Sequence, residues 1–218
     1  MNTGPLRTAV LISGTGSNLK TLIEASNRGR LNLDLCQVIS SRADAPGLEH
    51  ARTAGIPAEV ISESDGGLQD QKITACLRPH DPELVVLAGY MRILGRQPVE
   101  AFSGRMINLH PSLLPLFPGL DTYRRVLEAG NPMHGASIHF VTSELDAGPV
   151  IAQVQVPVRE NDTPGDLAAR VGPREHALLT ATVELFARRR VEMSHEQVLL
   201  DGQPISQPLQ LNEANVFA

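Results

Sequence analysis

The chain has 218 residues, enough for one large domain or two small ones, and 42% of them are hydrophobic, as expected for a globular protein with a substantial core. Acidic residues outnumber basic ones by 24 to 19, and the net charge of −5 argues against nucleic acid as the main partner, because phosphate backbones bind to dense basic surfaces. No apolar stretch is long enough to span a membrane, and Cys36 and Cys76 have no zinc-site spacing, so we expect a cytoplasmic protein with no metal and no membrane contact.

Buried strands alternate with amphipathic helices over the first half of the chain. Strands are predicted at 8–12, 33–39, 58–61, 84–88 and 106–109, and helices at 18–28, 44–55 (with Asp44 as its cap) and 69–77. Parallel strands require crossover helices, and both faces of such a sheet are covered. This order therefore predicts an α/β fold with a doubly wound, mostly parallel, Rossmann-like sheet.

The pattern changes in the second half. Segments 135–141 and 150–158 alternate more strictly and lie close together, which predicts a C-terminal antiparallel extension of the sheet. A helix is expected to start at Thr163 with Pro164 at its first position, to break at Gly172-Pro173, and to be followed by a second helix to about 189. From Met193 onward we expect a loose tail or a short hairpin around Asp201-Gly202.

A glycine-containing loop, Gly14-Thr15-Gly16-Ser17-Asn18, follows the first strand and precedes the first helix. Free N–H groups and the helix dipole at such a place favour a bound phosphate. The dinucleotide pattern GxGxxG is incomplete, because Leu19 stands at the third glycine position. Ser40-Ser41-Arg42, after the second strand, would suit the 2′-phosphate of NADP, so an NADP-dependent reductase stays open, as does a glycine turn without a ligand.

Asn108 and His110 are two residues apart on the fifth predicted strand, so their side chains face the same side at its carboxyl end. An amide that stabilises an oxyanion, next to an imidazole that moves a proton, suits acyl transfer. Alternatively, Asn108 is a turn residue and His110 a packed histidine. On sequence grounds alone, Asp146 would cap its own turn and His139 would be a half-exposed strand residue.

Four segments together resemble a known family: ISGTGSNL, VLAGYMRIL, INLHPSLLPLFPGLDTYRRVLEAG and HGASIHFVTSELDAGPVIAQ. They are similar to the folate-dependent glycinamide ribonucleotide formyltransferases of purine biosynthesis, from the first strand to Glu175-His176. The resemblance implies the formyltransferase fold in a single domain over 1–218. It divides that domain into a phosphate-binding half (about 6–105), a catalytic and folate-binding half (about 106–192) and a tail (about 193–218).

The same resemblance implies the substrates and the site. The donor would be 10-formyltetrahydrofolate and the acceptor glycinamide ribonucleotide, and no metal would be needed. The resemblance is compatible with a homodimer. Asn108, His110 and Asp146 match the catalytic trio. Gly16, Ser17 and Asn18 match the phosphate loop, and Glu175, expected in the first turn of the last helix, matches a ribose contact. The folate pocket is implied at Met91, Arg92, Ile93, Leu94, Asn108, Thr142, Ser143, Glu144, Leu145 and Asp146.

Two relatives of similar core remain as alternatives. Formyltetrahydrofolate deformylase usually carries an extra N-terminal domain, and methionyl-tRNA formyltransferase an extra C-terminal RNA-binding domain. A first strand that begins near residue 8 does not fit the deformylase, and the tail after Met193 does not fit the methionyl-tRNA enzyme. Within the implied trio, we expect the Asp146 carboxylate to raise the pKa of His110 by favouring its charged form.

Overall fold

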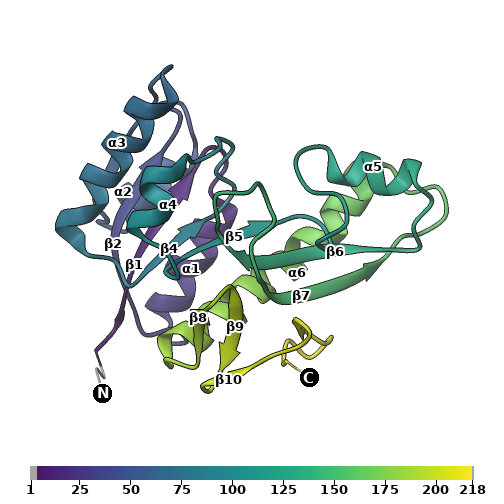
Figure 1. Cartoon of the computed structure of the whole chain (residues 1–218). Coiled ribbons are helices and arrows are strands. Elements are labelled where there is room, and N and C mark those ends of the chain that lie inside the picture. The colour runs from purple at the N-terminus through teal and green to yellow at the C-terminus, as the bar shows by residue number, and fades with distance from the viewer. Residues whose placement is uncertain (1–3, 218) are drawn as a thin grey trace.

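The computed structural model describes residues 4–217, so the domain limits predicted at 1 and 218 fall outside the described part. Its centre is an eight-stranded sheet in the order β11-β7-β6-β5-β4-β1-β2-β3, which runs across the molecule in Figure 1. A second, three-stranded sheet has the order β10-β9-β8. The strands are β1 (Leu6–Ile12), β2 (Leu33–Ser40), β3 (Ala58–Val60), β4 (Leu84–Leu87), β5 (Met106–His110), β6 (Met133–Phe140), β7 (Val150–Pro157), β8 (Val191–Ser194), β9 (Gln197–Leu200), β10 (Gln203–Pro204) and β11 (Leu209–Gln210).

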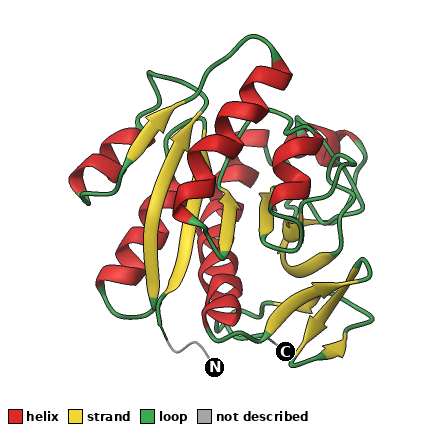
Figure 2. Cartoon of the chain, turned by 60° about the vertical axis from the view of Figure 1, so that its left-hand side comes forward, coloured by secondary structure: helices red, strands yellow, loops and turns green. Residues whose placement is uncertain are grey.

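Strands β1 to β5 pair in parallel, and helices cover both faces of this part (Figure 2). Side chains of β1 alternate between two cores: Val10 and Ile12 pack with α1 and α6, whereas Ala9 and Leu11 pack with α3 and α4. The helices are α1 (Ser17–Asn27), α2 (Gly47–Thr53), α3 (Gly66–Leu77), α4 (Arg96–Ala101), α5 (Thr122–Glu128) and α6 (Pro164–Ala187), with a short 3₁₀ turn at Arg78–His80. The predicted doubly wound parallel sheet is confirmed.

Strands β5, β6 and β7 pair antiparallel, which confirms the predicted extension. One face of this part is apolar: Ile138, Phe140 and Val154 pack against residues of α6 in the larger core. The opposite face carries buried polar side chains, among them Ser137 and Gln153. Loops cover that face in place of helices, and this difference creates the room for a site.

The loop after β5 is fastened to that polar face by hydrogen bonds. The Ser137 hydroxyl donates to the Ser112 carbonyl (2.7 Å) and accepts from the Leu114 N–H (3.0 Å). The Gln153 amide donates to the Leu114 carbonyl (2.8 Å) and to the Ser137 oxygen (2.9 Å). Buried polar groups that are all paired in this way hold a loop in one arrangement.

Several predicted boundaries were wrong. Helix α2 begins at Gly47 without a side-chain cap, because Asp44 forms its hydrogen bonds with Arg42 instead. Helices α4 and α5 were not predicted; each is only one or two turns long and shows little periodicity.

Helix α6 does not break at Gly172-Pro173 but runs through Pro173. A proline costs one backbone hydrogen bond, and burial of Val171 and Leu178 on either side keeps the helix continuous. The segment after Met193 is not loose: β8, β9 and β10 form the small sheet, with Asp201-Gly202 in the turn that was expected, and β11 joins the main sheet beside β7.

Candidate active site

A cavity of about 850 Å³ opens where the carboxyl ends of β4 and β5 meet the loops that cover the polar face of β6. This volume lies within the range of sites for small molecules. Side chains from both halves of the chain line it. They include Asn18, Met91, Arg92, Ile93, Leu94, Asn108, His110, Tyr123, His139, Thr142, Ser143, Glu144, Leu145, Asp146 and Glu175. Apart from Gly16 and Ser17, every residue expected at the site is in that lining.

The Asp146 carboxylate is the meeting point of the polar cluster. Its Oδ2 lies 3.4 Å from His110 Nδ1 and accepts a hydrogen bond from the Gly119 N–H (2.8 Å). Its Oδ1 lies 3.6 Å from His139 Nε2 and accepts from the Asn108 amide at 3.4 Å. The structure thus brings together Asn108, His110 and Asp146, which lie up to 38 positions apart in sequence.

The hydrogen bonds define which ring nitrogens carry protons. His139 Nδ1 donates to the Phe140 carbonyl (2.9 Å), so its Nε2 accepts from the Asn108 amide (3.1 Å). His110 Nε2 donates to the Phe117 carbonyl (3.0 Å), which turns Nδ1 toward Asp146. Nδ1 therefore gains a hydrogen-bond partner when His110 takes up a second proton.

Burial and charge act in opposite directions on these groups. Burial lowers the pKa of His110; the Phe117 carbonyl and the Asp146 carboxylate oppose that change but do not overcome it. The Asp146 charge acts to raise this pKa, as expected, but loss of solvent outweighs the charge pair and the net shift is downward. Burial also acts to raise the pKa of Asp146, yet contact with His139 and the Gly119 N–H hold it below its usual value. Asp146 is therefore a carboxylate, and His110 beside it is a neutral imidazole until it takes up a proton.

The glycine loop lies beside the cavity at the start of α1. Gly16 precedes the helix with φ +72°, a conformation that favours glycine, and an added Cβ would lie 2.5 Å from the Gly47 Cα. Ser17 is the first helical residue, and Asn18 enters the cavity lining. The Asn18 Oδ1 is buried and forms no hydrogen bond within the described residues 4–217, so it is available to a ligand.

The Ser40-Ser41-Arg42 segment does not offer the free groups that a 2′-phosphate would need. The Ser41 hydroxyl pairs with that of Ser13 at 2.6 Å, and Arg42 forms two hydrogen bonds with Asp44. Ser13 also accepts from the Met91 N–H (2.8 Å). These contacts connect the glycine loop to the 89–95 segment and leave little basis for an NADP site.

Glu175 enters the cavity from the middle of α6, not from the first turn of a helix as expected, because α6 continues through Pro173. Its Oε1 accepts a hydrogen bond from the Tyr123 hydroxyl at 3.0 Å. Burial raises the pKa of Glu175, and the Tyr123 contact partly opposes that rise. The Tyr123 ring packs edge to face against His134, with centroids 5.1 Å apart.

Some of the expected folate residues are exposed apolar side chains of the cavity lining. Met91, Ile93 and Leu145 expose 66%, 76% and 57% of their surface, and Leu120, also in the lining, exposes 69%. Exposed apolar side chains in the lining of a cavity favour a flat or apolar ligand.

Sequence reasoning missed two residues of the site. His139 is 2% exposed and not half-exposed as expected. Strand pairing could have indicated that His139 belongs to the site, because the antiparallel register places it directly opposite Asn108. Tyr123 lies on α5, a helix without a clear pattern, and no signal in the sequence pointed to it.

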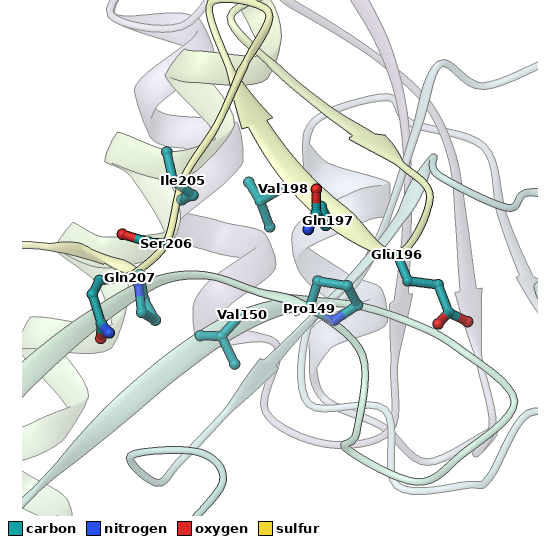
Figure 3. A pocket seen from close by; sticks show the side chains of 9 residues that line it. Pro149, Val150, Glu196, Gln197, Val198, Ile205, Ser206 and Gln207 are labelled. Carbon is teal, nitrogen blue, oxygen red and sulfur yellow. The ribbon is translucent and has the colours of Figure 1, made fainter.

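A second cavity of about 230 Å³ lies between the start of β7 and the small sheet (Figure 3). Pro149 and Val150 form one wall, and Val198 with the 205–208 segment forms the other. It contains none of the expected site residues. Over residues 4–217, no group of three or more histidine, cysteine or acidic side chains is arranged to hold a metal ion, and no helix has the length and apolar character of a membrane span.

Known proteins share this arrangement. Residues 6–183 match the family described as formyl transferase. Phosphoribosylglycinamide formyltransferase of Escherichia coli K12 is 45% identical over 197 residues, covering 89% of this chain and 93% of that protein. The structure of the phosphoribosylglycinamide formyltransferase of Coxiella burnetii superposes with a TM-score of 0.88 at 43% identity, over 93% of this chain and 96% of that one. A formyltetrahydrofolate deformylase of Pseudomonas syringae superposes with a TM-score of 0.85 at 26% identity, and this chain covers 66% of its length.

Proposed function

The chain belongs to the formyl transferase family, and from that premise we propose how its cavity carries out the reaction. The reaction is the transfer of the formyl group of 10-formyltetrahydrofolate to the amine of N1-(5-phosphoribosyl)glycinamide, in purine biosynthesis. A nitrogen–carbon bond forms at the acceptor amine, the bond to the folate nitrogen breaks, and one proton moves from the amine to that nitrogen. The observation that carries the assignment of roles is the Asn108–His110–Asp146 cluster inside one cavity.

We infer that Asn108 stabilises the negative charge that develops on the formyl oxygen. Its amide N–H lies at a long 3.4 Å from Asp146, a weak hydrogen bond that a stronger acceptor replaces at low cost. His139 accepts the other N–H of the same amide and so fixes its orientation. His139 thus acts through Asn108 and not on the substrate.

His110 and Asp146 carry the proton in this scheme. Nε2 donates to the Phe117 carbonyl and Nδ1 faces the carboxylate, so a proton taken up at Nδ1 forms a hydrogen bond with Asp146. When the amine attacks, an imidazolium paired with Asp146 stabilises the negative charge, and the proton passes on to the leaving folate nitrogen, directly or through water. A neutral imidazole can accept a proton and return it within the reaction.

The two substrates would enter from opposite sides. Support for the ribonucleotide site comes from the start of α1 with the partner-free Asn18 Oδ1 and from the Glu175 carboxylate, a strong acceptor for ribose hydroxyls. The exposed apolar side chains of Met91, Ile93 and Leu145 suit the flat pterin and aromatic rings of the folate. In this scheme residues 6–105 supply the phosphate side, and residues 106–192 the catalytic and most of the folate side, within a single domain; a homodimer and a cytoplasmic location stay predictions.

The assay follows folate absorbance after mixing the purified chain with 10-formyltetrahydrofolate, with and without the ribonucleotide. We expect tetrahydrofolate to appear only when the ribonucleotide is present, in equal amount to the formylated product. Release of tetrahydrofolate and formate without the acceptor would instead identify a deformylase. No turnover with both substrates present would contradict the proposal.

A further inference from the structure

The loop 117–121, between the Leu114-Pro115 segment and α5, supplies one contact to each half of the His110–Asp146 pair. The Phe117 carbonyl accepts from His110 Nε2 at 3.0 Å, and the Gly119 N–H donates to Asp146 Oδ2 at 2.8 Å. A small movement of this loop would therefore change the orientation of the imidazole and of the carboxylate together.

The backbone of this loop is not in a relaxed conformation. Phe117 has φ +54° and Asp121 has φ +56°, both in the left-handed region that side chains other than glycine disfavour. Each such residue costs on the order of 1 kcal/mol. Contacts from elsewhere in the fold are needed to hold the loop in this conformation.

Arg125, in the middle of the seven-residue helix α5, makes those contacts. Its Nη1 donates to the Pro118 carbonyl and, at 3.3 Å, to the Leu120 carbonyl. The guanidinium carbon lies 5.6 Å from the centroid of the Phe117 ring, within the distance of a cation–π interaction. Arg125 itself is not part of the cavity lining.

We propose that Arg125 is a positioning residue: its guanidinium fixes loop 117–121 and thereby holds the His110 imidazole and the Asp146 carboxylate in the geometry that formyl transfer needs. The inference rests on the roles proposed above for His110 and Asp146. A misplacement of about 1 Å in a reacting group can reduce the rate on the order of 100-fold, so a residue outside the cavity can have a large effect on turnover.

The same arginine acts on His110 through its charge, which gives a readout that a purely structural role would not affect. The groups that face His110 are Asp146 and His139 in the cluster, His134 behind it, and Arg125. The Arg125 charge contributes to the lowered pKa of His110. Removal of that charge should move the limb of the pH–rate profile that follows His110 to higher pH.

Two variants separate the charge from the loop contacts. Arg125→Met removes both, whereas Arg125→Lys retains the charge but not the planar set of donors. The matched control is Arg124→Met, because Arg124 precedes Arg125 and meets the loop only at the Asp121 side chain, whereas Arg125 contacts its carbonyls and the Phe117 ring. For each purified variant, kcat, both KM values, the pH–rate profile and the thermal midpoint are measured in the ribonucleotide-dependent assay.

We expect Arg125→Met to lower kcat by about 10- to 100-fold, with both KM values within threefold of wild type and the His110 limb shifted upward. Arg125→Lys should lower kcat several-fold without that shift, and Arg124→Met should behave as wild type. A kcat within twofold in Arg125→Met, an equal loss in Arg124→Met, or a loss without the pH shift would overturn the proposal. If Arg125→Met does not fold, Arg125→Gln replaces it under the same criteria. Wild-type inactivity would contradict the proposed function instead.

Discussion

Strands β1 to β4 and strands β5 to β7 contribute to the cavity in different ways. In the first region helices cover both faces of the sheet, and the proposed ligand groups are backbone at a strand–helix turn and Asn18 just inside α1. In the second region α6 covers one face only, and buried side chains project from the other face beneath loops.

This difference suits the two regions to different functions, binding in the first and proton transfer in the second. The first region offers the fixed dipole at the start of α1, which suits binding of an anion whose charge does not change. The second region brings the buried His110 and His139 together with Asp146 and the half-buried Glu175, which suits proton transfer. Changes in the second region should therefore affect turnover and pH dependence, and changes in the first should affect affinity for one substrate.

The largest effect is expected from the catalytic cluster. Asp146→Asn keeps the size of the side chain but removes the charge that pairs with His110, and loss of one positioned acid–base group lowers kcat on the order of 10²- to 10⁴-fold. Because the groups act together, Asp146→Asn with His110→Ala should be little worse than the worse single variant. Near-normal turnover in Asp146→Asn, or two losses that multiply, would show that the pair is not a unit.

Acid should destabilise the protein through the second region. Burial, and after it the charge of His110, lower the pKa of His134 from 6.5 to about 4. Below pH 6.5 the unfolded chain takes up a proton that the folded chain refuses, so stability is lost as the pH falls toward 4, by about 3 kcal/mol for this group. Urea unfolding across this range should show a flatter pH dependence in His134→Phe. An identical slope in both proteins would rule His134 out as the cause.

A binding effect is expected from the first region. Asn18→Ala removes the buried Oδ1 that has no partner in the described fold, and loss of the hydrogen bond that this oxygen would accept from the ribonucleotide should raise KM for the ribonucleotide about tenfold. KM for the folate and kcat should stay within twofold. Asn27→Ala, at the exposed end of the same helix, is the control. A substitution of Gly16 is less suitable for this test, because the added Cβ would displace Gly47 and so disturb more than the substrate contact.

The smallest effect tests the boundary between the regions. Tyr123→Phe keeps the ring against His134 but removes the donor to Glu175, which should raise KM for the ribonucleotide about fivefold. The pKa of Glu175 should rise further, because the phenol now opposes the effect of burial. The fall of kcat/KM in acid should accordingly begin at a higher pH. An unchanged profile would mean that Tyr123 contributes packing alone.

The two regions also differed in how far the sequence predicted them. Short apolar strands between amphipathic helices follow local rules, so β1 to β5 were expected within a residue or two. Asn108 and His110 were expected to share a face because a strand has a period of two. No local pattern identifies Asp146 as a site residue, because an aspartate in a turn usually caps its own backbone, and Asp146 has the turn conformation, with φ +51°. Only the family resemblance connected it to His110. The lowered pKa of His110 depends on burial by distant loops, which no local pattern encodes.

Strand β11 has a consequence beyond its two residues. It pairs with β7 on the side away from β6, and Arg174 of α6 holds the segment that follows through Asn215 and the Leu211 and Asn212 carbonyls. An outermost strand with unpaired backbone groups is a template on which other copies of a protein can add their own strands. Leu209 and Gln210 pair with Ala152 and Gln153 and so occupy backbone groups of β7 that would otherwise form such an edge. A chain whose synthesis has not reached Leu209 leaves those groups of β7 open.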